Sequence, residues 1–179
     1  RPEFVELLFG IAMAGAVAVP INARYQPGEL AYLVRDADLV VLVTSGRMSD
    51  DLDFADRLHR ALPSLEGAGD RKKLDIAEAP RLRQIICIDE PCGAGLLPSI
   101  DAKAFGDGVA EAEVDRRIDA LDPESTGLIL YTSGTTANPK GCLIRHRGIV
   151  CNSRNLAKRY EMQEGDRFWS PLPIYHIAG

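Results

Sequence analysis

Three uninterrupted aliphatic runs constrain the fold of this chain more than any other feature. They are LVVLVTS at Leu39–Ser45, QIICI at Gln84–Ile88 and GLILY at Gly127–Tyr131. Runs of this kind are typical of strands buried on both faces of a parallel sheet. Helical patterns lie between them, and one that opens with PGEL predicts a helix over Pro27–Asp36. The alternation predicts an α/β fold with a mainly parallel sheet flanked by helices.

Shorter segments add to this prediction. Ala16–Val19 is expected to form a short buried strand that ends at Pro20, and Ser49 to cap a third helix whose Leu58 and Leu62 face the core. The polar stretch Leu65–Pro80 is expected to be a surface loop. Near the end of the chain, the sequence predicts a returning strand, a helix and a further short strand, at Gly141–Arg145, Ile149–Tyr160 and Arg167–Ser170 respectively.

Composition excludes several classes of protein. The chain has 179 residues, is 46% hydrophobic and carries a net charge of −5, so a general attraction to nucleic acid is not expected. Its longest apolar stretch, Leu7–Pro20, is shorter than the ~20 residues that a membrane span needs. The four cysteines show no CxxC pairing, which is typical of reduced packing residues in a cytosolic protein. The sequence begins inside a helical pattern, so the chain is expected to be a piece of a longer protein.

The segment YTSGTTANPKG, Tyr131–Gly141, carries the clearest chemistry. It follows a predicted strand, and ligands of open α/β sheets bind beyond the carboxyl ends of strands. Small hydroxyl side chains and free backbone N–H groups donate to phosphate oxygens, and Lys140 adds a mobile positive charge. The spacing does not fit a Walker A loop, because Pro139 stands at its second glycine position. A solvated turn with an exposed lysine is the alternative.

The order of these residues resembles the phosphate-binding signature of the adenylate-forming superfamily, the AMP-binding acyl-CoA synthetases and their relatives. That signature reads [ST]-[ST]-G-[ST]-T-G-x-P-K-G, and Ala137 departs from its second glycine. Two further segments, at residues 2–45 and 165–179, resemble the start of the large domain and the family's next motif. The signature is matched by Thr132, Ser133, Gly134, Thr135, Thr136, Pro139, Lys140 and Gly141.

The resemblance implies that a carboxylic acid attacks the α-phosphate of ATP, which releases pyrophosphate, and that the acyl group then passes to coenzyme A. Lys140 and His176 are the implied catalytic residues, and Tyr175 and His176 the implied acyl-site residues. The implied phosphate donors are Thr132, Ser133, Gly134, Thr135, Thr136 and Lys140. Mg²⁺ is expected to arrive with ATP, and no metal ligand is assigned within the chain. A packed core position is the alternative for His176 and Tyr175.

The resemblance also implies that residues 1–179 are an incomplete N-terminal AMP-binding domain, inactive alone, of a cytoplasmic enzyme such as one of fatty acid metabolism. Two other functions stay open: an adenylation domain that loads a carrier protein, and a nucleotide-binding or scaffold fragment without turnover. His146 stands where the last helix is expected to begin, and it is expected to cap that helix or to be exposed to solvent. Neither the acid nor the oligomeric state follows from the sequence.

Overall fold

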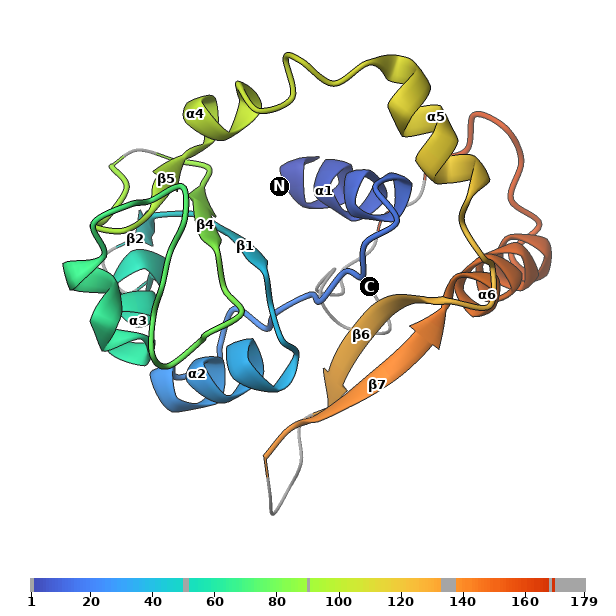
Figure 1. Cartoon of the computed structure of the whole chain (residues 1–179). Coiled ribbons are helices and arrows are strands. Elements are labelled where there is room, and N and C mark those ends of the chain that lie inside the picture. The colour runs from blue at the N-terminus through green and yellow to red at the C-terminus, as the bar shows by residue number, and fades with distance from the viewer. Residues whose placement is uncertain (1, 50–51, 90, 133–137, 168, 170–179) are drawn as a thin grey trace. The chain divides into compact units, whose positions relative to one another are not determined.

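The computed structural model describes residues 2–49, 52–89, 91–132, 138–167 and 169. The chain divides into two compact units, of which unit 1 comprises residues 1–23 and 110–179 and unit 2 comprises residues 24–109. Figure 1 labels the elements of both units. Within the described ranges, no helix is both long enough and apolar enough to cross a membrane.

Unit 2 contains the parallel sheet. Strand β1 (Val41–Thr44) pairs in parallel with β4 (Gln84–Cys87), and β4 pairs in parallel with β5 (Leu97–Pro98). Helix α2 (Pro27–Asp36) packs beside α3 (Phe54–Ala61) (Figure 1). The predicted parallel sheet, its β1 and β4 strands and the α2 bounds are therefore confirmed. The remaining elements of the unit are β2 (Arg47–Ser49), β3 (Leu52–Asp53), the 3-10 helix η1 (Pro63–Gly67) and α4 (Ser99–Lys103).

Unit 1 is built from both ends of the chain. It consists of α1 (Pro2–Met13), α5 (Glu111–Asp119), the antiparallel strands β6 (Thr126–Thr132) and β7 (Lys140–Arg145), and α6 (His146–Arg159). The expected strand at Ala16–Val19 is reduced to a single parallel bridge between Ala18 and Leu128. The expected Arg167–Ser170 strand falls partly outside the described residues, and Arg167 and Trp169 are not in a strand. Helix α5 was not predicted.

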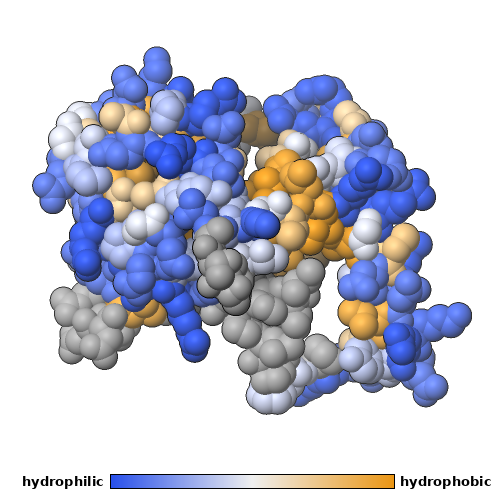
Figure 2. Space-filling model, turned by 90° about the horizontal axis from the view of Figure 1, so that it is seen from below, coloured by the Kyte–Doolittle hydropathy of each residue, from blue (hydrophilic) through white to orange (hydrophobic). Residues whose placement is uncertain are grey.

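Burial differs between the units. Within the described residues, the buried apolar side chains of unit 1 are those of Ala18 and Pro139, whereas unit 2 has a leucine-rich core. Large apolar side chains of α1 and α6, such as Phe9 and Leu156, are exposed. In Figure 2, hydrophobic residues are uncovered on one face of the molecule. The described part of unit 1 therefore has exposed apolar surface on its helices.

The segment Leu65–Pro80 is largely exposed and is irregular after η1, as its polarity predicted, but its leucine and isoleucine side chains are buried. Leu65, Leu74 and Ile76 are almost completely buried, with at most 1% of each side chain exposed. Backbone contacts tie the segment to the residues before β4, because the Leu74 N–H donates to the Arg83 carbonyl at 2.8 Å. Each buried Leu or Ile contributes about 1.5–3 kcal/mol, so a few of them hold an otherwise polar segment inward.

The third helix begins later than expected. Ser49 lies in β2, and α3 begins at Phe54 with Asp53 as its N-cap, whose carboxylate accepts a hydrogen bond from the Asp56 N–H at 2.9 Å. The prediction of Ser49 as the cap is therefore wrong, although Leu58 and Leu62 are buried as expected. An aspartate satisfies a free N–H of the first turn and also complements the helix dipole.

Removing this cap tests its contribution. We expect Asp53→Ala to lower the opening free energy of the α3 amides by about 1 kcal/mol, measured by native-state hydrogen exchange. Asp53→Asn keeps an acceptor oxygen at the same place and should change it by less than half as much. Equal protection of the α3 amides in Asp53→Ala and the original protein would contradict the assigned cap.

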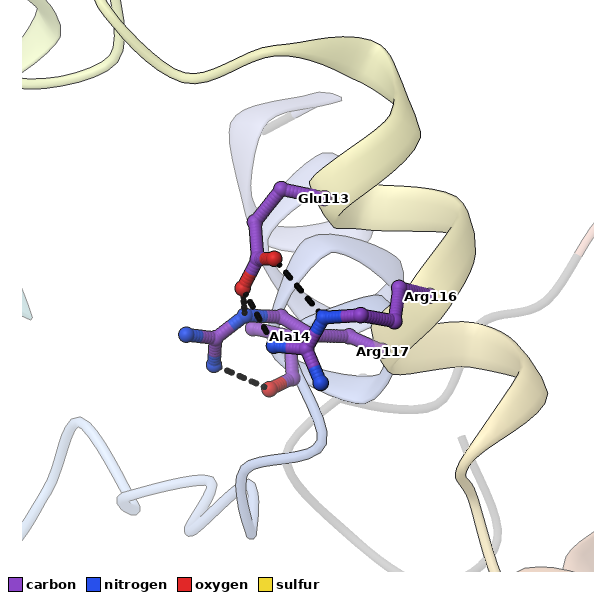
Figure 3. Close-up of polar contacts among 4 residues, drawn as sticks. All are labelled: Ala14, Glu113, Arg116 and Arg117. Carbon is purple, nitrogen blue, oxygen red and sulfur yellow. Dashed lines mark hydrogen bonds and ion pairs between the residues drawn. The ribbon is translucent and has the colours of Figure 1, made fainter.

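In unit 1, an exposed charge cluster joins α5 to the end of α1 (Figure 3). Glu113 accepts hydrogen bonds from Arg116 at 2.8 and 2.9 Å and from Arg117 at 2.9 Å. Arg117 also donates to the Ala14 carbonyl at 3.3 Å. The last turn of α1 has no basic residue of its own, so Arg117 supplies the positive charge that a helix C-terminus favours.

The same cluster predicts a pH dependence. Hydrogen bonds from Arg116 and then Arg117 lower the pKa of Glu113. Since the folded-state pKa is the lower one, the contribution of this cluster to stability is present above the ordinary carboxyl pKa and is lost as the pH falls through the lowered value. We expect an NMR titration to show the Glu113 pKa rising in Arg116→Ala and staying unchanged in Arg154→Ala on α6. An equal pKa in all three proteins would contradict the pairing.

Candidate active site

The β6–β7 hairpin positions the candidate phosphate site. Strand β6 is held on both sides: the Ala18 N–H donates to the Gly127 carbonyl at 3.0 Å, the Ile129 N–H donates to the Ala18 carbonyl at 2.8 Å, and β7 pairs along the other edge. The last pair of the hairpin is Thr132 with Lys140. The aliphatic run Gly127–Tyr131 therefore lies in a strand that is hydrogen-bonded along both edges. The hydroxyl-rich segment follows the carboxyl end of this strand in the sequence.

Thr132 and Lys140 lie on the same face of the hairpin, because directly paired residues of antiparallel strands share a face. Both residues are exposed, and the Thr132 hydroxyl donates to the Lys140 carbonyl at 3.4 Å. No ion pair joins the Lys140 ammonium to another described residue. The structure thus brings together a cation and a hydroxyl that the sequence placed eight residues apart.

The residues beside Lys140 fix the hairpin end. Pro139 is buried although Asn138 and Lys140 on either side of it are exposed. Gly141 pairs with Tyr131, and a Cβ added to Gly141 would lie 3.2 Å from the Tyr131 ring and 3.0 Å from the Ile129 side chain. The glycine that follows the lysine therefore makes room for the neighbouring aromatic ring, a packing role that the sequence motif alone did not reveal.

Several predicted site residues lie outside the described residues. They are Ser133, Gly134, Thr135, Thr136, Tyr175 and His176. Of the predicted site, the structure therefore places Thr132 and Lys140.

His146 begins α6 as expected, but it does not cap the helix, because the N-cap is Arg145. Its side chain is only partly exposed. The His146 ring lies against Gly127, where an added Cβ would come within 2.6 Å of its Cε1 atom. The first N–H groups of the helix donate instead to the carbonyls of Ser125 and Pro123. His146 is thus a packing residue of the hairpin base, made possible by a glycine at the β6 irregularity.

The segment from Lys140 to Tyr160 is rich in lysine and arginine. One carboxylate that lies before it in the sequence pairs with two of its arginines. Glu124 accepts a hydrogen bond from Arg145 at 3.0 Å and pairs with Arg147. Sequence reasoning missed this pairing, because Glu124 precedes β6 and meets the two arginines only after the hairpin returns. The lysine at the hairpin end is not part of this pairing, so its charge remains available to a ligand.

The donor set at the hairpin end fits an anion. A lysine ammonium and a hydroxyl offer hydrogen-bond donors, as phosphate oxygens require. In the described part of the chain, no group of three or more His, Cys, Asp or Glu side chains could hold a metal ion. The described residues at the hairpin end are therefore hydrogen-bond donors of the kind that an anionic group requires.

The architecture, with a strand that leads into this hairpin, defines the chain as a mixed α/β protein. Comparison with known proteins then gives its family. The family model for AMP-binding enzymes matches residues 1–179. The chain belongs to the AMP-binding enzyme family.

Individual relatives agree with this assignment. The chain is 31% identical over 183 residues to the mouse mitochondrial medium-chain acyl-CoA ligase ACSF2, covering 98% of this chain and 29% of that protein. It is 29% identical over 180 residues to the chalcone synthase cfoA of Aspergillus candidus, covering 99% of this chain and 6% of the synthase. The crystal structure of ATP-bound MatB from Rhodopseudomonas palustris matches with a TM-score of 0.63 and 26% identity, covering 98% of this chain and 29% of MatB. The chain therefore spans about a third or less of the length of these relatives.

Proposed function

We propose that the protein containing this chain is an ATP-dependent carboxylate–CoA ligase. It would join a carboxylic acid to AMP with release of pyrophosphate, and then transfer the acyl group to coenzyme A. The pairing of Thr132 with Lys140 at the loop end of the hairpin carries this proposal, together with membership of the AMP-binding family. The names of two relatives, an acyl-CoA ligase and an ATP-bound enzyme, support it.

The main barrier to the proposed reaction is electrostatic repulsion between two anions. A carboxylate anion must approach the α-phosphate of a polyanion, and cations aimed at the phosphates lower that barrier. Lys140 would bind the β- and γ-phosphates, which become pyrophosphate when the α-phosphate bond breaks. Thr132 would add a hydroxyl donor from the same face of the hairpin.

The residues outside the described ranges keep the roles that the motif implies. We propose that Tyr175 lies beside the acyl group and that His176 donates to the carboxylate or the α-phosphate. The remaining phosphate donors would be Ser133, Gly134, Thr135 and Thr136.

We further propose that residues 1–179 form part of an N-terminal AMP-binding domain and are inactive alone. The chain's short coverage of its relatives and the exposed apolar side chains of unit 1 support this. Mg²⁺ would enter with ATP, because it is commonly bound through substrate phosphates. The reaction would take place in the cytoplasm, with fatty acids among the candidate substrates.

A panel of carboxylic acids tests the proposal. The full-length protein is incubated with ATP, Mg²⁺ and each acid in turn, and pyrophosphate release is measured. Acids that give release are then tested with coenzyme A for thioester formation. We expect at least one acid to give both products, and release with no acid of the panel would contradict the ligase function.

The match to cfoA supports a second candidate, an adenylation domain that loads a carrier protein. The chain covers only 6% of that synthase, which leaves room for many other domains in one polypeptide. Pyrophosphate release without a CoA thioester, together with acylation of a carrier domain, would favour this function. A protein that binds ATP and forms no acyl-adenylate would instead be a scaffold, the outcome to which Ala137 in place of the usual glycine points.

A further inference from the structure

Two cysteine thiols meet at one carbonyl oxygen in unit 2. Cys87 ends β4 and Cys92 follows the next turn, and both thiols donate to the carbonyl of Asp89, at 2.8 and 3.3 Å. The two sulfurs are therefore no farther apart than the sum of these distances. Cys92 Sγ also lies 3.9 Å from the carbonyl oxygen of Cys87. The turn between the cysteines thus brings the two thiols together.

The sheet holds this turn in place. The Ile88 N–H, directly after Cys87, donates to the Thr44 carbonyl at the end of β1 at 2.8 Å. Gly46 packs against the turn, because a Cβ added there would lie 3.4 Å from the Asp89 oxygen and 3.7 Å from Cys87 Sγ. The proximity of the thiols is therefore a property of the folded strands.

The two thiols differ in their access to solvent. Cys87 is 1% exposed, whereas Cys92 is partly exposed. A small oxidant in solution would therefore reach Cys92 first, with Cys87 positioned behind it. An accessible thiol beside a second, resolving thiol is the arrangement found in redox-responsive cysteine pairs.

We propose that Cys87 and Cys92 form a dithiol that hydrogen peroxide converts to a disulfide. Peroxide oxidises the Cys92 thiol to a sulfenic acid and releases one water. The Cys87 sulfur then attacks the Cys92 sulfur, the S–O bond breaks, and a second water leaves with the Cys87 proton. Both hydrogen bonds to Asp89 are lost in the process, and a dithiol reductant restores them by thiol–disulfide exchange.

The positions of the basic residues make this pair easy to follow. Trypsin releases both cysteines in one peptide, Gln84–Lys103, whereas Cys142 and Cys151 fall in the separate peptides Gly141–Arg145 and Gly148–Arg154. The full-length protein is treated with hydrogen peroxide, unfolded, alkylated with iodoacetamide and digested. We expect the Gln84–Lys103 peptide to lose two hydrogens and to accept no alkyl group, and dithiothreitol to restore two alkylation sites.

Two variants make the result specific. In Cys92→Ser, Cys87 should remain fully alkylatable after peroxide treatment, because no sulfenic acid forms beside it. Cys142→Ser should leave the loss of two hydrogens unchanged. Circular dichroism of the treated protein confirms that the reaction takes place in the folded state.

Three outcomes would overturn the proposal. One is a stable sulfinic acid on Cys92 while Cys87 still accepts an alkyl group. Another is a disulfide that joins either cysteine to a different peptide. The third is no oxidation of the Gln84–Lys103 peptide under conditions that oxidise the exposed Cys142 or Cys151. None of these results depends on ligase activity, so the proposed function is tested separately.

Discussion

Replacing Lys140 by alanine in the full-length protein is expected to slow ATP–pyrophosphate exchange by about 100- to 1000-fold, the usual cost of removing one preorganised group that stabilises transition-state charge. The lysine is exposed at the start of β7, and no described residue forms an ion pair with it, so its loss should leave the fold intact. The effect should fall mainly on kcat if the lysine stabilises charge on the departing pyrophosphate.

Two control variants separate this effect from general charge. Lys158→Ala removes a lysine from the last turn of α6 and should leave exchange within about twofold of the original rate, since a distant surface charge is screened. Lys140→Arg keeps the charge but changes the donor geometry, so partial activity is expected. An undiminished rate in Lys140→Ala would remove this residue from the mechanism.

Gly95→Ala is expected to destabilise unit 2 by about 2–5 kcal/mol. Gly95 has a φ of +72°, which costs an alanine about 1–2 kcal/mol. An added Cβ would also lie 2.6 Å from the Leu65 side chain and 2.8 Å from its carbonyl oxygen. Leu65 is fully buried, so it has no room to move, and overpacking of this kind adds about 1–3 kcal/mol.

Native-state hydrogen exchange of the β1 and β4 amides measures this loss within unit 2 itself. Gly28→Ala is the matched control, because Gly28 lies in the first turn of α2 with nothing within 4 Å of an added Cβ. It should leave the same amides unchanged or raise their protection by up to about 1 kcal/mol. Similar effects of the two alanines would show that the contact with Leu65 is not a source of strain.

The predictable part of the fold was the part governed by local pattern. Continuous aliphatic runs and a proline at the first helical position determined β1, β4, β6 and α2. The predictions failed where the burial of a side chain depends on residues far away in the sequence. Val40 and Val41 were expected to be buried on both faces of the sheet, yet they are 48% and 45% exposed.

The helix α5 shows a different kind of failure. Its sequence is mostly charged and carries no apolar stripe long enough to suggest a helix. Its signal was present in the spacing of charges, since Glu113 precedes arginines by three and four residues and such pairs stabilise a helix. Charge spacing would have found the helix and its local ion pairs, but not the hydrogen bond from Arg117 to the Ala14 carbonyl.

For the candidate site, the sequence predicted which residues form the hairpin but not the packing contacts that hold the hairpin in place. The pairing of Thr132 with Lys140 follows from two strands that return on each other, which the pattern did predict. The packing of Tyr131 over Gly141 and of His146 over Gly127 depends on the space left by absent side chains. Such contacts are set by three-dimensional proximity, and no periodicity in the sequence encodes them.

The bridge between Ala18 and Leu128 has a consequence for how the protein is made. Ribosomes add about 5–20 residues each second, so the nascent chain presents Ala18 roughly 5–20 s before its partner strand exists. Unit 2, an unbroken stretch of polypeptide, is synthesised completely during that wait and is free to fold first. During that interval the apolar side chains of α1 are present without the rest of unit 1, and transiently exposed apolar surface of this kind is prone to aggregation.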